Sequence, residues 1–187
     1  MKKIFFLAAM FAAFSIASFA QAKPTDFSGT WNLDIPKSQL DVRVRLEALT
    51  MTVAQTDKEL KVTTETKRPA PPADAAAQPG PNGPGGGRGM RGFGGGDGTV
   101  SYSLEGKETV VEADGPNGKM PIKYKATLEA GKVNLSTTRS FNGPMGDITA
   151  TTKDTWTLSA DGKTLTDVRV QSSPRGESTS TLVFVKK

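Results

Sequence analysis

Short, regularly spaced turns constrain the fold of this chain more than any other feature of its sequence. Three of them, Asp114–Gly118, Glu129–Gly131 and Asp161–Gly162, separate segments that are rich in Thr and Val. Gly beside Asn or Asp supplies the positive φ that tight hairpins need, and β-branched residues favour pleated strands. From Phe27 onward no segment shows a sustained helical period. The pattern predicts an all-β chain of short sequential strands.

Alternation of apolar and polar residues marks the expected strands. Leu49, Met51 and Val53 share one face of a segment whose other face carries Thr, which is typical of a sheet with unlike faces. Sequential strands of this kind form an antiparallel up-and-down meander, and we expect a β-barrel of about 8–10 strands because closure removes exposed edges. The expected strands are Gly29–Asp34, Leu46–Gln55, Glu59–Lys67, Thr99–Leu104, Glu108–Ala113, Met120–Leu128, Lys132–Phe141, Asp147–Leu158, Lys163–Gln171 and Glu177–Val185.

The stretch from Arg68 to Gly98 interrupts this pattern. It is rich in proline and contains the runs Gly85–Gly87 and Gly94–Gly96. Because such a composition buries little apolar surface, we expect a long disordered insertion between two strands. Its glycines lack the Gly-Lys-Ser/Thr ending of a phosphate loop. Its arginines and Phe93 resemble an Arg-Gly-Gly nucleic-acid segment, but a flexible linker is the favoured interpretation.

The first 22 residues have the organisation of a secretory signal peptide. Lys2 and Lys3 form a basic start, residues 4–19 carry no charge, and Ala20-Gln21-Ala22 is a small-residue cleavage site. The uncharged run is shorter than the about 20 residues of a membrane-spanning helix. We therefore expect cleavage after Ala22, or after Ala20, with a mature domain over residues 23–187 and a periplasmic or extracellular location.

The chain contains no Cys and no His. These absences exclude disulfides, a lipid-anchor cysteine, thiol nucleophiles, Ser-His-Asp triads and imidazole or thiolate metal sites. The carboxylate pairs Glu105/Glu108 and Asp154/Asp167 remain open for hydrolysis, but the sequence around them indicates ordinary exposed charge. We expect no catalytic residue, no metal and no cofactor. The net charge is +5, and it becomes smaller when Lys2 and Lys3 are removed with the signal peptide. So weak a positive charge does not predict a nucleic-acid partner.

Four motifs resemble, in order, those of the bacterial secreted lipocalin-like proteins. The opening Phe27–Asp34, followed by Lys37-Ser38, resembles their Gly-x-Trp strand and Lys-Ser pair. Tyr102–Glu108, Trp156–Thr166 and Val183–Lys186 resemble their mid-chain turn, late hairpin and final strand. The resemblance spans the chain after residue 22 except for the insertion. It implies a lipocalin-like, calycin-type barrel and implies no activity.

The leading functional hypothesis is non-enzymatic binding of a small apolar or amphipathic ligand, because a barrel of this size can hold one such molecule. Trp31 is expected to plug the closed end of the barrel, with its ring against Arg169 or Arg175. The candidate ligand-lining residues are Met51, Tyr102, Tyr124, Leu135 and Trp156.

Two other functions stay open at this point. The main alternative is an envelope or extracellular interaction module with a filled core and no ligand, and the volume of the cavity distinguishes the two. An outer-membrane barrel is disfavoured, because the chain has few aromatics for two girdles and ends in Lys186-Lys187. Oligomeric state is not predicted.

Overall fold

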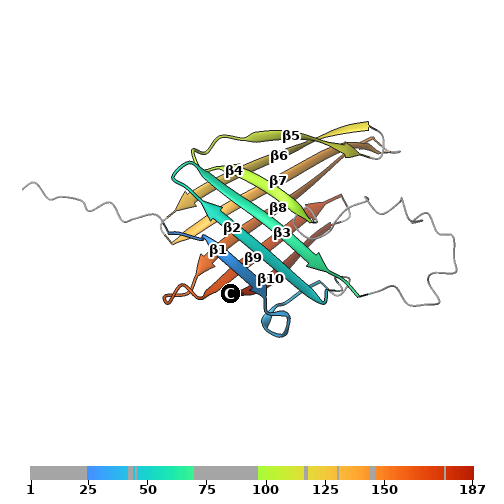
Figure 1. Ribbon diagram of the computed structural model, residues 1–187. Helices are drawn as coiled ribbons and strands as arrows, with labels where there is room; N and C mark the ends of the chain where they lie inside the picture. The colour runs from blue at the N-terminus through green and yellow to red at the C-terminus, as the bar shows by residue number, and fades with distance from the viewer. Residues whose placement is uncertain are drawn as a thin grey trace, which may run out of the picture.

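The protein is an all-β barrel with strands in sequential order (Figure 1). The computed structural model describes residues 25–41, 44, 46–69, 97–115, 118–129, 131–143, 146–174 and 176–187. Its one helical element in these ranges is a short 3-10 helix, η1 (Ile35–Lys37). The strands are β1 (Gly29–Leu33), β2 (Ala48–Gln55), β3 (Glu59–Lys67), β4 (Gly98–Ser103), β5 (Thr109–Gly115), β6 (Gly118–Glu129), β7 (Lys132–Gly143), β8 (Gly146–Leu158), β9 (Thr164–Ser173) and β10 (Gly176–Lys186).

All strands belong to one antiparallel sheet whose order is β4-β3-β2-β1-β10-β9-β8-β7-β6-β5. Chain neighbours pair with each other, and β1 also pairs with β10, where Trp31 lies opposite Lys186. This pairing brings the first and the last strand together. β4 and β5 form the two edges and do not pair; β4 instead approaches β6, and Figure 1 shows β4 and β5 diverging. The barrel is therefore nearly closed, with one gap between β4 and β5.

The turn between β8 and β9 forms where Asp161-Gly162 predicts it. In the β8–β9 turn, Asp161 accepts hydrogen bonds from the Ser159 hydroxyl at 2.5 Å and from the Lys163 N–H at 3.0 Å. These bonds lower the pKa of the Asp161 carboxyl, because both favour its ionised form. Gly162 follows with φ +66°, a conformation that L side chains rarely adopt. The predicted hairpin is confirmed.

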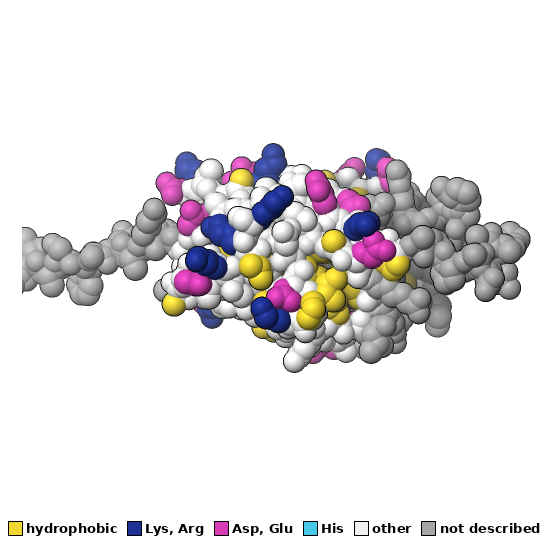
Figure 2. Space-filling view, turned by 60° about the horizontal axis from the view of Figure 1, so that its bottom comes forward, with side chains coloured by type: hydrophobic (Ala, Val, Ile, Leu, Met, Phe, Trp, Pro, Cys, Tyr) yellow, Lys and Arg dark blue, Asp and Glu magenta, His cyan; other side chains and the backbone are white. Residues whose placement is uncertain are grey.

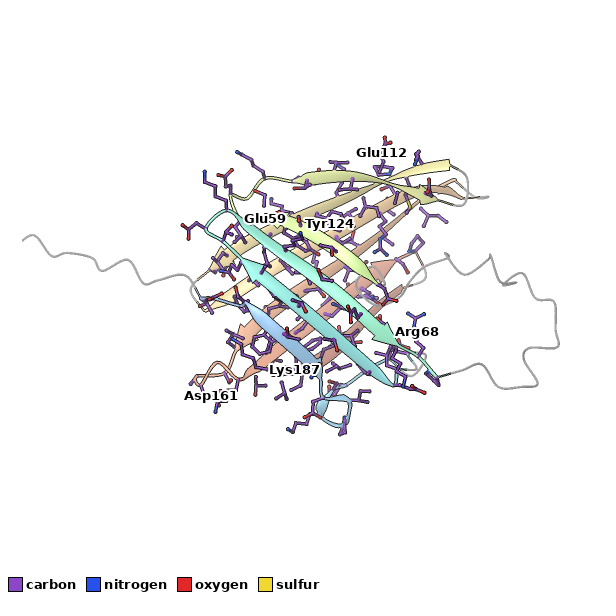
Figure 3. The ribbon with its side chains drawn as sticks, in the orientation of Figure 1. Glu59, Arg68, Glu112, Tyr124, Asp161 and Lys187 are labelled. Atoms are coloured by element: carbon purple, nitrogen blue, oxygen red, sulfur yellow. The ribbon has the colours of Figure 1, made fainter. Side chains whose placement is uncertain are left out.

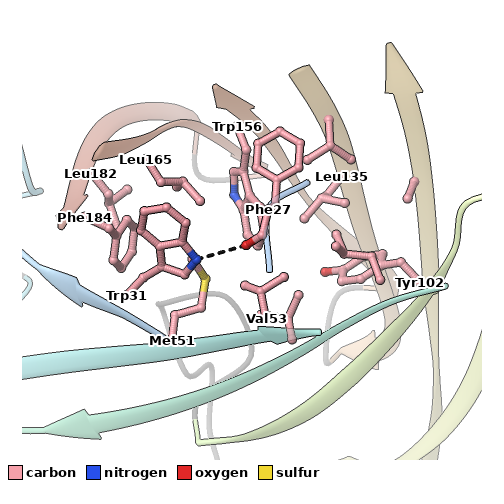
Figure 4. Close-up of a cluster of buried hydrophobic side chains, with 14 of the residues drawn as sticks. Phe27, Trp31, Met51, Val53, Tyr102, Leu135, Trp156, Leu165, Leu182 and Phe184 are labelled. Atoms are coloured by element: carbon pink, nitrogen blue, oxygen red, sulfur yellow. Dashed lines mark hydrogen bonds between the residues drawn. The ribbon is translucent and has the colours of Figure 1, made fainter. Parts of the chain in front are cut away.

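Trp31 and Phe27 fill one end of the barrel (Figure 4). Both side chains are fully buried, and the Trp31 Nε1–H donates to the Phe27 carbonyl at 3.0 Å. Gln55 holds the segment before β1 in place, because its Oε1 accepts from the Phe27 N–H at 3.0 Å and its Nε2 donates to the Thr25 carbonyl at 2.9 Å. The core role expected of Trp31 agrees with this packing.

The cation against Trp31 is not the one expected. Lys186 Nζ lies 5.1 Å from the centre of the Trp31 ring, whereas Arg169 is bound to two carboxylates elsewhere in the barrel. The sequence could not show this because it depends on the β1–β10 register. Arg175, the other candidate, lies outside the described residues.

The connection between β1 and β2 was not predicted. η1 follows Asp34, whose carboxylate pairs with Lys37 Nζ at 2.9 Å. The Ser38 hydroxyl then accepts from the Val183 N–H at 2.9 Å, and Gln39 forms a bridge with Thr181. Ser38 and Gln39 therefore tie this connection to β10.

The predicted insertion, residues 68–98, is shorter at its C-terminal end than expected. Asp97 accepts from the Thr66 N–H at 2.7 Å, and Gly98 begins β4 opposite Thr64. Residues 70–96, which include the proline- and glycine-rich part, lie outside the described residues. The predicted signal peptide, residues 1–22, lies outside them as well.

Charge on the surface is mixed in sign. Figure 2 shows one face, on which Lys and Arg side chains lie beside Asp and Glu side chains. Exposed ion pairs on the molecule include Lys67–Glu47 at 3.1 Å and Lys119–Asp114 at 2.9 Å. In the described ranges no helix is long and apolar enough to cross a lipid bilayer.

Candidate functional site

A cavity of about 170 Å³ opens beside the gap in the barrel. Val62, Val100 and Tyr102 from β3 and β4 form one wall. Ile122 and Tyr124 from β6 and Arg139 from β7 form the other. Figure 3 shows Tyr124 on β6, next to β4. The cavity exists here because β4 and β5 do not pair, so side chains from β4 and β6 face each other directly.

A second, smaller cavity of about 40 Å³ lies deeper in the barrel. It shares Val62, Thr64 and Tyr102 with the outer cavity, so the two spaces adjoin at these side chains. Its lining adds apolar side chains that point inward from β2, β7, β8 and β10. These are Leu49, Met51, Leu135, Trp156 and Phe184.

All five candidate ligand-lining residues border one of the two cavities. Met51, Leu135 and Trp156 line the inner one, Tyr124 lines the outer one, and Tyr102 lines both. They were chosen as apolar and amphipathic side chains on predicted strands, and the alternation of side chains along each strand places them inside the barrel. That they contact a ligand stays a prediction.

Tyr102 and Tyr124 lie next to each other in the lining of the outer cavity, and Tyr102 also borders the inner one. Their rings meet edge to face with centres 5.5 Å apart, and the Tyr102 hydroxyl lies 3.3 Å from the Thr137 hydroxyl. Burial raises the pKa of Tyr102 to about 12, and burial also raises the pKa of Tyr124. Both hydroxyls therefore stay protonated at neutral pH and can donate or accept a hydrogen bond.

Asp154, Asp167 and Arg169 form a buried charged cluster that the sequence interpretation missed. Arg169 Nε donates to Asp154 Oδ1, and Arg169 Nη2 donates to Asp167 Oδ2 at 3.1 Å. The side chains of these residues are 6%, 1% and 10% exposed respectively, so the expected ordinary exposed charge is wrong for this pair of carboxylates. Alternation carried the signal, because Asp167 and Arg169 share a face of β9 with buried Leu165. Asp154 and Arg169 are also direct partners across β8 and β9.

Burial dominates the protonation of this cluster. It raises the pKa of Asp167 to about 8; the nearby Arg169 opposes the shift and the charge of Asp154 adds to it. Burial alone would lower the pKa of Arg169, but the two carboxylates outweigh it and hold the guanidinium ionised. Because Asp154 and Asp167 both bind its guanidinium, Arg169 is not free to pair with an anionic ligand.

The other carboxylate pair is exposed, as expected. Glu105 pairs with Lys107 Nζ at 2.8 Å, and Glu108 pairs with Lys123 Nζ at 3.1 Å. Within the described ranges, no group of three or more His, Cys, Asp or Glu side chains is placed to hold a metal ion.

No protein-family model matches this sequence, and no curated protein matches it significantly. Among solved structures, the zebrafish ileal bile acid-binding protein complexed with cholic acid is similar, with a TM-score of 0.44 and 16% sequence identity. The match covers 86% of this chain and 98% of that protein. At this level of similarity function is inferred from the cavities and their side chains alone.

Proposed function

We propose that this protein binds a small apolar or amphipathic molecule inside the barrel and leaves it chemically unchanged. The observation that carries the proposal is the pair of adjoining cavities, which open at the β4–β5 gap and are lined by aromatic and aliphatic side chains with a few polar groups. This mixture is typical of small-molecule sites. Few side chains could catalyse a reaction of the ligand, because the chain has no Cys or His and both buried carboxylates pair with Arg169.

The size of the cavities favours a small ligand. The outer cavity of about 170 Å³ is below the range of about 300–1,000 Å³ that drug-sized ligands occupy. The end of the barrel opposite to the opening is filled by Trp31 and Phe27. A ligand therefore enters only as far as Trp156 and Phe184 on the inner cavity.

An interaction module without a ligand is the second candidate. Val110 and Val111 on the edge strand β5 are 55% and 48% exposed, and an exposed edge strand is a surface on which another chain can pair. The small cavity volume also fits this alternative. Ligand binding should be blocked by a side chain that fills the cavity, whereas pairing with another chain should be blocked by a change on the exposed face of β5.

Filling the cavity tests the proposal. Val62 lines both cavities, so Val62→Phe should abolish saturable binding of short-chain amphiphiles followed by Trp156 emission. Val110→Phe is the matched control, because it makes the same change on an exposed position of β5 and should leave binding intact. Saturable binding that survives Val62→Phe, or no binding to the unmodified protein, would contradict the proposal and favour the interaction module.

We also propose that the protein is exported as one of the bacterial secreted lipocalin-like proteins, to the periplasm or the medium. The basic start, uncharged run and Ala20-Gln21-Ala22 site support export, and the four ordered motifs support the family. N-terminal sequencing of the exported protein should begin at Lys23. A sequence that begins at Met1 would contradict it.

A further inference from the structure

We infer that the ligand carries an anionic end group, which Arg139 holds at the mouth of the outer cavity while the apolar part of the ligand points toward Trp156. This inference rests on the proposed function and specifies the ligand class of the same site. The outer cavity lies beside the gap in the barrel, and Arg139 is the one cation among the described residues that line it.

Strand register places Arg139 on the inner wall. Arg139 lies opposite Ile122, whose side chain is 9% exposed and points into the barrel. Tyr124, two residues along β6, is therefore its diagonal neighbour on the same face. The positive charge of Arg139 acts on the Tyr124 hydroxyl and lowers its pKa against the effect of burial. A guanidinium and a phenol thus sit side by side at the opening.

These groups have hydrogen-bonding capacity that the protein leaves unused. In the described part of the chain Arg139 forms no ion pair, although the residue is partly buried. Neither the Tyr124 hydroxyl nor the Thr64 hydroxyl, which lines the facing wall, takes part in a hydrogen bond there. A guanidinium with an unused planar fork matches a carboxylate or a similar planar anion.

The other arginine inside the barrel is not available for this role. Arg169 lies beside the inner cavity, but it is bound by both Asp154 and Asp167. Asp154 borders the inner cavity together with Arg169, and the two side chains pair with each other, so neither charge is available to hold an anion there. The distribution of charge therefore favours an anionic end at the mouth and an uncharged end inside.

Asp97 also lines the outer cavity, and its position determines how an anionic ligand is oriented there. It belongs to the β3–β4 wall, where its Oδ1 accepts from the Thr66 N–H at 2.7 Å. An anionic end group is driven from this wall toward Arg139 on β7. The apolar remainder then lies between Val62, Tyr102 and Ile122 and reaches the inner cavity.

Three probes of equal chain length test the inference: octanoate, 1-octanol and octylammonium. Binding is measured by calorimetry on the full protein and by the chemical shift of the Ile122 methyl group. We expect octanoate to bind about tenfold more tightly than octanol, which corresponds to about 1.4 kcal/mol, and octylammonium to bind most weakly. Arg139→Gln should remove the preference for octanoate, and Arg139→Lys should keep part of it. Lys125→Gln is the matched control, because Lys125 is an exposed cation on the outer face of β6 and should not matter.

The outcomes separate this inference from the proposed function. Two results would show that the anionic end group is wrong while ligand binding stands: octanol binds as tightly as octanoate, or octylammonium binds best. In either case Arg139→Gln would leave the ranking of the three probes unchanged. If none of the three probes moves the Ile122 signal, the proposed function fails and the inference fails with it. A preference for octanoate that Lys125→Gln removes as fully as Arg139→Gln would assign it to the overall charge and overturn the role of Arg139.

Discussion

At the scale of single residues, the Gly-x-Trp opening has a physical explanation in the β1–β10 pairing. Gly29 has φ +142°, a conformation that residues with a side chain avoid. A Cβ atom at this position would lie 2.6 Å from Lys186 Cε, and the Lys186 ammonium lies 5.1 Å from the centre of the Trp31 ring. The glycine therefore leaves room for the lysine chain that reaches Trp31.

Removing the Trp31 side chain should cost much of the stability of the barrel. Trp31 is fully buried and its indole is hydrogen-bonded to Phe27, so Trp31→Ala leaves a large cavity and an unpaired carbonyl. We expect the free energy of unfolding in urea to fall by about 3–5 kcal/mol, and Trp31→Phe to lose less. Unchanged stability with a loss of ligand binding would place Trp31 in a pocket instead.

Asp167 should make stability depend on pH. Its pKa is raised in the folded state, so folding takes up a proton between the unfolded value near 3.8 and about 8. Its contribution to stability is therefore fully present at low pH and is lost as the pH rises through this range. The Asp167→Asn side chain cannot titrate. Between pH 5 and pH 9 we therefore expect the free energy of unfolding of the unmodified protein to fall by at least about 1 kcal/mol more than that of the variant, which is about the free energy of a shift of one pKa unit. Parallel urea-unfolding curves for the two proteins across this range would contradict the raised pKa.

Alternation predicted inward-facing aromatics better than inward-facing charges. Tyr102 and Trp156 were chosen because an apolar or amphipathic side chain on a strand has an obvious buried side. Asp167 and Arg169 follow the same alternation, but a charged side chain is usually exposed, so its partners must be known before burial is plausible. Those partners lie on another strand, and only the β8–β9 register identifies them.

At the scale of elements, every predicted strand is present, and the differences are confined to the ends. β3 has the predicted bounds, while β6 and β8 begin earlier because their first residues, Gly118 and Gly146, pair across the hairpin. The β1–β2 connection escaped prediction because contacts with β10, distant in sequence, hold η1 and Ser38 in place. The local sequence pattern predicts the pairing of strands that are adjacent in the chain. Contacts between residues far apart in the sequence can be identified only once the fold is known.

Replacing residues 70–96 with a short Asn-Gly-containing turn should leave the barrel intact and slightly more stable. The ends of this segment are already joined, because Asp97 binds the Thr66 N–H and Gly98 pairs with Thr64. Each halving of a flexible loop saves about 0.6 kcal/mol of closure entropy, so the free energy of unfolding should rise by about 1 kcal/mol. A clear fall in the thermal midpoint would show that the segment packs on the barrel.

At the scale of the whole molecule, closure depends on one pairing that joins the first strand to the last, β1 to β10. β1 lies between β2 and β10, and the break in the sheet lies in mid-chain, between β4 and β5. The sequence predicted a closed meander because sequential strands favour it, but it could not locate the gap, since β4 and β5 are joined by a connection like any other. The cavity depends on that gap, so its position and volume were also beyond prediction.

The position of the gap can be tested by moving the chain ends. Two circular permutants would join Lys187 to Thr25 through a Gly/Ser linker, which is feasible because the Lys187 N–H donates to the Thr30 carbonyl at 2.9 Å. One would open between Gly106 and Lys107, and the other between Asp161 and Gly162.

The first cut separates β4 from β5, which do not pair, and breaks only an exposed Lys107–Glu105 ion pair of small value. The second cut breaks the hydrogen-bonded Asp161 turn between two strands that pair along their length. We expect the second permutant to be less stable than the first by at least about 1 kcal/mol, since a lost turn and an opened hairpin fall in that range. Equal stability, measured by urea unfolding, would mean that β4 and β5 are coupled more tightly than their lack of pairing implies.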